Sequence, residues 1–156
     1  MIVVVRVRIR VEADGGITET AALACSGYEA ETPQLMVPAK FMEEFGCQLP
    51  KHAVKVEFDT AGGPLTMRAV PSGCKVQAVA ESPIVKADLV ISPIVDEVLL
   101  NDKLIGELQL SLEDMGKGLW RFSWEPKEKL RKSLPLKRYG TSKQELRRIR
   151  HRRVEV

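Results

Sequence analysis

The sequence is poor in the residues that usually build metal centres and disulfide frameworks. It contains two histidines and three cysteines in 156 residues, and Cys25, Cys47 and Cys74 form no CxxC pair. Such wide spacing excludes both a typical zinc motif and a disulfide-stabilised scaffold. We therefore expect three reduced thiols, with no metal and no cofactor.

Long apolar runs are missing as well. The first run, residues 2–5, has no basic residue before it and ends at Arg6, which does not fit the pattern of a signal peptide. No run approaches the roughly 20 apolar residues of a membrane-spanning helix. We predict a cytoplasmic protein without membrane contact, in one domain long enough to bury a core.

Charge is distributed unevenly along the chain. Residues 1–125 contain 12 Lys and Arg against 18 Asp and Glu, a balance of −6. Residues 126–156 contain 12 against 3, a balance of +9. The sequence thus predicts an acidic domain over residues 1–125 and a basic C-terminal extension over residues 126–156.

Alternating apolar residues predict a β-rich domain. Residues 3–11 alternate with arginines and a glutamate, Asp14-Gly15-Gly16 has turn composition, and residues 17–24 fit the returning strand of a hairpin. A second hairpin is predicted with strands 53–58 and 65–70 around the tip 61–64. Further strands are expected at residues 74–80, 87–93, 98–100, 108–112 and 119–124.

Two short helices interrupt these strands. The first follows Pro38, has apolar residues on one face and stops at Gly46. The second, over residues 102–108, is capped by Asn101 or Asp102. Helix content is therefore small, and the fold class is mainly β.

Three motifs resemble those of the retropepsin-like (retroviral-type) aspartic proteases. An apolar strand ends in Cys25-Ser26-Gly27, at the position of the family's Asp-Thr-Gly, and Leu99-Leu100-Asn101 precedes a helix where the family has two apolar residues and glycine. The hairpin with the Gly62-Gly63 tip matches the family's flap. The chain is also similar to a group of archaeal proteins without an assigned activity, through Ser26-Gly27-Tyr28-Glu29 and Gly118-Leu119-Trp120-Arg121-Phe122.

The resemblance implies a closed β-barrel with short helices over residues 1–125 and a homodimer whose cleft lies between turn and flap. The family needs two aspartates, one per subunit, that share one proton. Here Cys25 occupies that position, and a thiol with a pKa of about 8.5 is neutral at pH 7 and a poor general acid. We therefore expect a catalytically degenerate binding module for an extended peptide or protein segment. The degenerate catalytic motif is Cys25, Ser26 and Gly27, and the cleft and flap candidates are Tyr28, Glu29, Glu31, Gly62, Gly63 and Asn101.

Several of these residues have two interpretations. Tyr28 fits either a cleft pocket or the core, and Glu29 and Glu31 fit either ligand contact or solvated loop charges. A residual or re-purposed peptidase with Cys25 as nucleophile would need a base, His52 or His151, whereas a lone cysteine is commonly a structural thiol. Asp59-Thr60-Ala61-Gly62 resembles the missing catalytic motif, but an alanine separates threonine from glycine, and a solvated hairpin tip is the simpler interpretation.

The extension is predicted to be partly helical, over residues 127–133 and 142–153, and loosely attached or disordered. Its arginines would attract phosphate and give weak, sequence-independent nucleic-acid binding. A solubilising extension is the other interpretation. The nucleic-acid candidates are Arg147, Arg148, Arg150, Arg152 and Arg153.

Overall fold

The first hairpin follows directly from the alternation in the sequence. The computed structural model describes residues 4–48 and 52–140, and in it β1 (Arg6–Ala13) pairs antiparallel with β2 (Gly16–Ala24) around the turn Asp14-Gly15. The valines and isoleucine of β1 are fully buried while Arg8 and Arg10 are exposed. One face of the hairpin therefore forms a wall of the core, and the other faces solvent.

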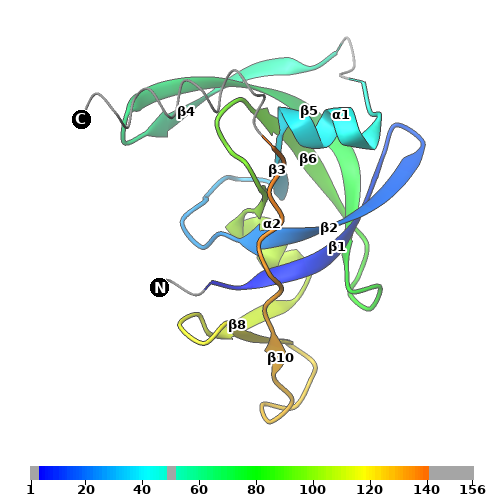
Figure 1. The fold of residues 1–156 in the computed structure, drawn as a ribbon, viewed down its shortest axis with the longest axis vertical. Helices are drawn as coiled ribbons and strands as arrows, with labels where there is room; N and C mark the ends of the chain where they lie inside the picture. The colour runs from blue at the N-terminus through cyan, green and yellow to red at the C-terminus, as the bar shows by residue number, and fades with distance from the viewer. Residues whose placement is uncertain (1–3, 49–51, 141–156) are drawn as a thin grey trace.

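The remaining elements include the predicted ones in order, with two strands, β3 and β10, that were not predicted. They are β3 (Gln34–Pro38), α1 (Ala39–Phe45), β4 (Val54–Thr60), β5 (Gly63–Ala78), β6 (Val85–Ser92), β7 (Val98–Leu100), α2 (Asp102–Glu107), β8 (Leu110–Asp114), β9 (Leu119–Phe122) and β10 (Arg131–Lys132) (Figure 1). Both predicted helices are present, and the mainly-β fold class is confirmed.

Six strands close into a barrel. The hydrogen-bonded order is β1-β2-β7-β3-β6-β5, and β5 pairs with β1 from Ile9↔Ala78 to Glu12↔Lys75 to complete the circle. β4 lies outside this circle and pairs with β5 alone among the described strands. The β4–β5 hairpin, called the flap below, therefore extends beyond the barrel wall (Figure 1).

β5 differs from the prediction because it is one long strand rather than two. It runs over 16 residues, and its pairing with β6 shifts between Val70 and Cys74. At this bulge Ser72 has a positive φ of 51°, and a Cβ on Gly73 would lie 2.7 Å from the Cβ of Val70. Proline and glycine here signalled a break in the alternation, but the chain bulges and continues as the same strand.

The first half of the C-terminal extension is also different from the prediction. Residues 127–133 form no helix, and β10 instead pairs antiparallel with β9 in a second sheet of three strands, β10-β9-β8. Residues 133–139, which we call the strap, then run across the outside of β1 and β2 (Figure 1). The expectation of a loosely attached extension is therefore wrong for residues 126–140. The helix predicted over residues 142–153 lies outside the described residues.

Hydrogen bonds and one buried ring fix the strap at its two ends. Ser133 Oγ accepts a hydrogen bond from the Arg6 amide at 2.7 Å, and the Leu134 amide donates to the Arg6 carbonyl at 2.9 Å. At the other end the Tyr139 ring is 6% exposed and packs edge-on against Phe41 of α1, at 5.2 Å between centroids.

Within residues 4–48 and 52–140, no helix has the length and apolar character needed to cross a membrane.

Candidate binding cleft at the Cys25 turn

The Cys25 turn is positioned by the pairing of two strands in the barrel. β2 and β7 pair in parallel, with Ala24 opposite Leu100, and the Cys25 amide donates to the Leu100 carbonyl at 3.1 Å. The Tyr28 amide then donates to the Cys25 carbonyl, also at 3.1 Å, which closes the turn. Ser26 and Gly27 are exposed at its tip, and Cys25 is half-buried.

Gly27 does not use the conformational freedom of glycine. Its φ lies outside the left-handed range, and a Cβ at this position would meet no atom within 4 Å. By contrast Gly63, at the predicted flap tip, has a φ of 108°, which L side chains rarely adopt. The flap tip thus depends on glycine, whereas the Cys25 turn does not.

Asn101 lies behind the turn and organises it from inside. Its side chain is fully buried, and Oδ1 accepts hydrogen bonds from the amides of Leu104 (3.0 Å) and Gln34 (2.9 Å) while Nδ2 donates to the Thr32 carbonyl (2.9 Å). The predicted helix cap is therefore confirmed. Asn101 is a positioning residue that connects α2 to the loop after Cys25, and its side chain is not part of the cleft surface.

Tyr28 is held between this loop and the flap. Its hydroxyl donates to Gln34 Oε1 at 2.7 Å, and its ring packs edge-on against Phe58 of β4 at 6.2 Å. Burial, with a smaller contribution from the nearby Asp88 carboxylate, raises the pKa of the Tyr28 hydroxyl well above its usual range. The side chain is therefore a neutral, buried contact between turn and flap.

An apolar cluster continues from the turn onto the inner face of the flap. On this face of the hairpin Phe58 lies opposite Leu65 and Val56 lies opposite Met67. We call the whole set the cleft cluster; its buried members are Tyr28, Met36, Met67, Ala69 and Val90, and its half-buried members are Cys25, Ala30, Val56, Phe58, Leu65, Val95 and Leu99. This cluster is separate from the main core inside the barrel.

The loop after β6 adds apolar side chains that sequence reasoning did not single out. Ser92 Oγ accepts hydrogen bonds from the amides of Ile94 (3.2 Å) and Val95 (3.4 Å), which fixes the start of the loop. Val95 packs into the cleft cluster, while the adjacent Ile94 is 67% exposed. An apolar residue directly after Ser92-Pro93, in a segment with turn composition, was the available signal.

The acidic candidates do not take part in this contact network. Glu29 and Glu31 are exposed and form no ion pair with any described residue. The carboxylate that does act on the turn is Asp88 of β6, which accepts hydrogen bonds from Thr32 Oγ1 at 2.6 Å and from the Ser72 amide at 2.8 Å. It links the cleft loop to the β5 bulge.

The thiols differ in their surroundings. Cys25 Sγ makes no hydrogen bond with any described residue, so no neighbouring base or acid is held against it. Cys74 is buried and donates to the Ala87 carbonyl at 3.6 Å, and burial raises its pKa to about 12. Among residues 4–48 and 52–140, no group of three or more His, Cys, Asp and Glu side chains is placed to hold a metal ion.

The described members of the cleft cluster can thus contact an apolar ligand. The five C-terminal arginines proposed to bind nucleic acid lie outside the described residues, so their placement relative to the cleft cluster is not described. No protein-family model matches the chain, and a comparison with curated proteins finds no match either.

Proposed function

We propose that the chain is a catalytically silent, retropepsin-like binding module that works as a homodimer and holds an extended peptide or protein segment. The observation that carries this proposal is the cleft cluster, whose seven half-buried apolar members extend from the Cys25 turn to the flap. Apolar side chains left partly exposed in one contiguous patch are typical of surfaces that bind a partner.

The closed barrel and the projecting flap support the fold relationship. The Cys25 turn follows a strand that pairs in parallel with β7, and a two-residue turn between Thr60 and Gly63 forms the flap tip. In a retropepsin-like dimer, two such turns would face each other below two flaps. This arrangement would cover the apolar side chains that a single chain leaves half-buried.

Binding by strand addition suits the flap. β4 pairs with β5 on one side, and no described strand pairs with its other side, so its outer backbone groups are available to an extended segment. The inward side chains of Phe58 and Leu65 supply an apolar contact beside this edge. Backbone pairing would give affinity, and the apolar contact would give a preference for alternating apolar side chains in the ligand.

The lack of catalysis follows from Cys25. Acid–base hydrolysis by this fold needs two carboxyl groups that share a proton, and two thiols would both be neutral at pH 7. A Cys25 nucleophile would need a base within hydrogen-bond reach, and none of the described residues supplies one.

The first experiment measures oligomeric state and peptide binding together. Sedimentation should give a dimer mass, and a displayed library of extended peptides of about eight residues should yield ligands that alternate in apolarity. Phe58→Ser should weaken the selected peptide at least about tenfold. Ile84→Ser, which changes a 65% exposed isoleucine that is not a member of the cleft cluster, should leave the affinity unchanged.

A monomer at all concentrations would contradict the dimer, and equal effects of the two variants would contradict the cleft. The same library is then incubated with wild type and Cys25→Ala between about pH 3 and pH 9, a range that spans carboxyl and thiol titration. Cleavage products that disappear in Cys25→Ala would establish a peptidase and overturn the proposal of a silent module. If neither protein cleaves any peptide, the result agrees with the proposal of a silent module.

A further inference from the structure

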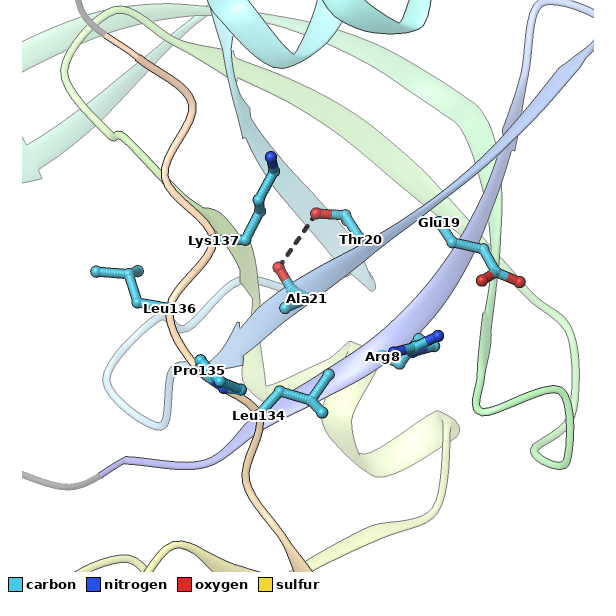
Figure 2. A pocket seen from close by; sticks show the side chains of 8 residues that line it. All are labelled: Arg8, Glu19, Thr20, Ala21, Leu134, Pro135, Leu136 and Lys137. Carbon is cyan, nitrogen blue, oxygen red and sulfur yellow. Dashed lines mark hydrogen bonds between the residues drawn. The ribbon is translucent and has the colours of Figure 1, made fainter.

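A cavity lies away from the cleft cluster, where the strap crosses the outer face of the β1–β2 hairpin. It has a volume of about 440 Å³ and is lined by Arg8, Glu19, Thr20, Ala21, Leu134, Pro135, Leu136 and Lys137. Figure 2 shows the strap residues along one side and the side chains of Arg8 and Glu19 coming from the two strands. We call it the strap pocket.

The strap pocket is preformed because its movable wall is tied down on both sides. The Leu134 amide donates to the Arg6 carbonyl before the pocket, and the Tyr139 amide donates to the Asp96 carbonyl at 2.7 Å after it. The Tyr139 hydroxyl also hydrogen-bonds Thr20 Oγ1 beneath the strap. A ligand therefore does not have to order this wall when it binds.

The charges in the pocket are unbalanced. Neither Arg8 nor Lys137 forms an ion pair with a described residue; Lys137 lies 5.4 Å from the Tyr139 ring centroid, and Arg8 makes no side-chain hydrogen bond. Glu19, the one carboxylate among the described lining residues, is paired with Arg10 at 3.7 Å. Two cations without an ion pair thus border a surface to which Ala21, Leu134, Pro135 and Leu136 contribute apolar side chains and Thr20 a hydroxyl.

From these features we infer that the strap pocket binds a small organic carboxylate with an apolar body, distinct from any ligand of the cleft. The Arg8 guanidinium presents paired donors that match a carboxylate, and Lys137 adds a second positive charge from the strap. Leu134 and Ala21 contact the apolar body. The volume falls within the range of small-molecule sites.

The test uses the full chain with octanoate as the probe, followed by amide chemical shifts in two-dimensional NMR. Saturable shifts are expected at Arg8, Ala21 and Lys137, and octanol, which has the same chain without the charge, should produce less than about a tenth of the binding. Arg8→Gln and Lys137→Gln should each weaken octanoate at least about fivefold. Because neither cation has an ion-pair partner among the described residues, both variants should fold, and Lys137→Gln loses only the cation–π contact with the Tyr139 ring.

Two further variants test whether the charges in the pocket lining control the affinity for octanoate. Glu19→Gln should tighten octanoate binding because it removes the one negative charge from the lining. Lys86→Gln removes an exposed lysine from β6, outside the pocket, and should change the affinity by less than twofold, since only distant, screened charge is lost. Equal binding of octanol and octanoate, no saturable shift at the pocket, or equal effects of Lys86→Gln and Arg8→Gln would each overturn the inference.

Discussion

The Glu125 carboxylate and the Arg131 guanidinium form two parallel hydrogen bonds, Nε to Oε1 and Nη2 to Oε2, both 2.9 Å long. The same carboxylate accepts the Phe122 amide at 2.9 Å, and Lys129 lies 3.0 Å from Oε2. The Glu125 side chain is 5% exposed. This contact connects the end of β9 to β10 and thereby starts the strap in a fixed direction.

Replacing Glu125 tests that connection. Glu125→Gln keeps the shape but removes the charge that holds Arg131, and we expect the free energy of unfolding to fall by about 1.5–3 kcal/mol in urea titrations. Glu128→Gln, three residues further on and exposed, is the matched control and should change stability by less than about 0.5 kcal/mol. Equal stability of the two variants would show that the Glu125–Arg131 contact does not stabilise the fold.

Acid sensitivity follows from the same carboxylate. Hydrogen bonding from Arg131, together with the Phe122 amide and Lys129, lowers the pKa of Glu125 from 4.5 to about 2 despite its burial. Because the folded pKa is depressed, this stabilisation is fully present above pH 4.5 and is lost as the pH falls toward about 2. Stability measured across this window should decline less steeply in Glu125→Gln than in the wild type, and parallel curves would contradict the assignment.

Asn101 should be among the most sensitive single positions. Asn101→Ala removes the helix cap and leaves the Gln34 amide and the Thr32 carbonyl without their partner, so we expect a loss of about 2–4 kcal/mol in unfolding free energy. Gln48→Ala, at an exposed position after α1, is the control. If Asn101→Ala lowers the free energy of unfolding by less than the removal of an ordinary helix cap does, the loop after Cys25 is held mainly by its other contacts.

The strap should contribute to stability through Tyr139. Tyr139→Phe loses the hydroxyl bond to Thr20 and should cost about 0.5–1.5 kcal/mol, whereas Tyr139→Ala also loses the packing against Phe41 and should cost about 3–5 kcal/mol. Thermal unfolding of both variants measures the difference. If the alanine variant is no less stable than the phenylalanine variant, the ring does not stabilise the core.

The hypothesis that the C-terminal tail binds nucleic acid is tested by truncation and by substitution. Deleting residues 141–156 should abolish binding to nucleic acid and spares Tyr139 and the strap, whereas a cut at residue 134 would remove both. Replacing the five arginines from 147 to 153 by glutamine should abolish binding to a generic duplex, and replacing them by lysine should keep a salt slope near −0.9 per phosphate contact. Binding that survives the glutamine replacement would exclude the tail as the contact.

The sequence predicted the local elements well because their signals are local. Alternation identified β1, turn residues identified the Asp14-Gly15 hairpin, and Asn101 before an apolar-faced segment identified the cap of α2. Closure of the barrel by β1 and β5 depends on pairing between residues far apart in the chain, such as Ile9 and Ala78, which are 78 − 9 = 69 positions apart, and no local pattern encodes it. The candidate cleft was therefore located at the Cys25 turn, but the contribution of Val95 emerged only from the folded arrangement.

The strap was missed for a different reason. Its apolar residues are few, and Leu134-Pro135-Leu136 has the composition of a break between elements. What holds the segment is one buried ring, Tyr139, together with backbone hydrogen bonds to Arg6 and Asp96. A single anchor residue has no periodicity, so pattern analysis assigned the whole segment to a loose extension.

The hydrogen bond from the Arg6 amide to Ser133 spans 127 positions of the chain. During synthesis from the N-terminus, β1 emerges from the ribosome long before its outermost partner exists, and at about 5–20 residues per second the delay lasts several seconds. Arg6 can pair with Leu23 of β2 early, but its bonds to Ser133 and Leu134 cannot form during that interval. The arginines alternating along the strand disfavour premature association of its edge. The order in which the chain is made thus places completion of its first strand among the last steps of folding.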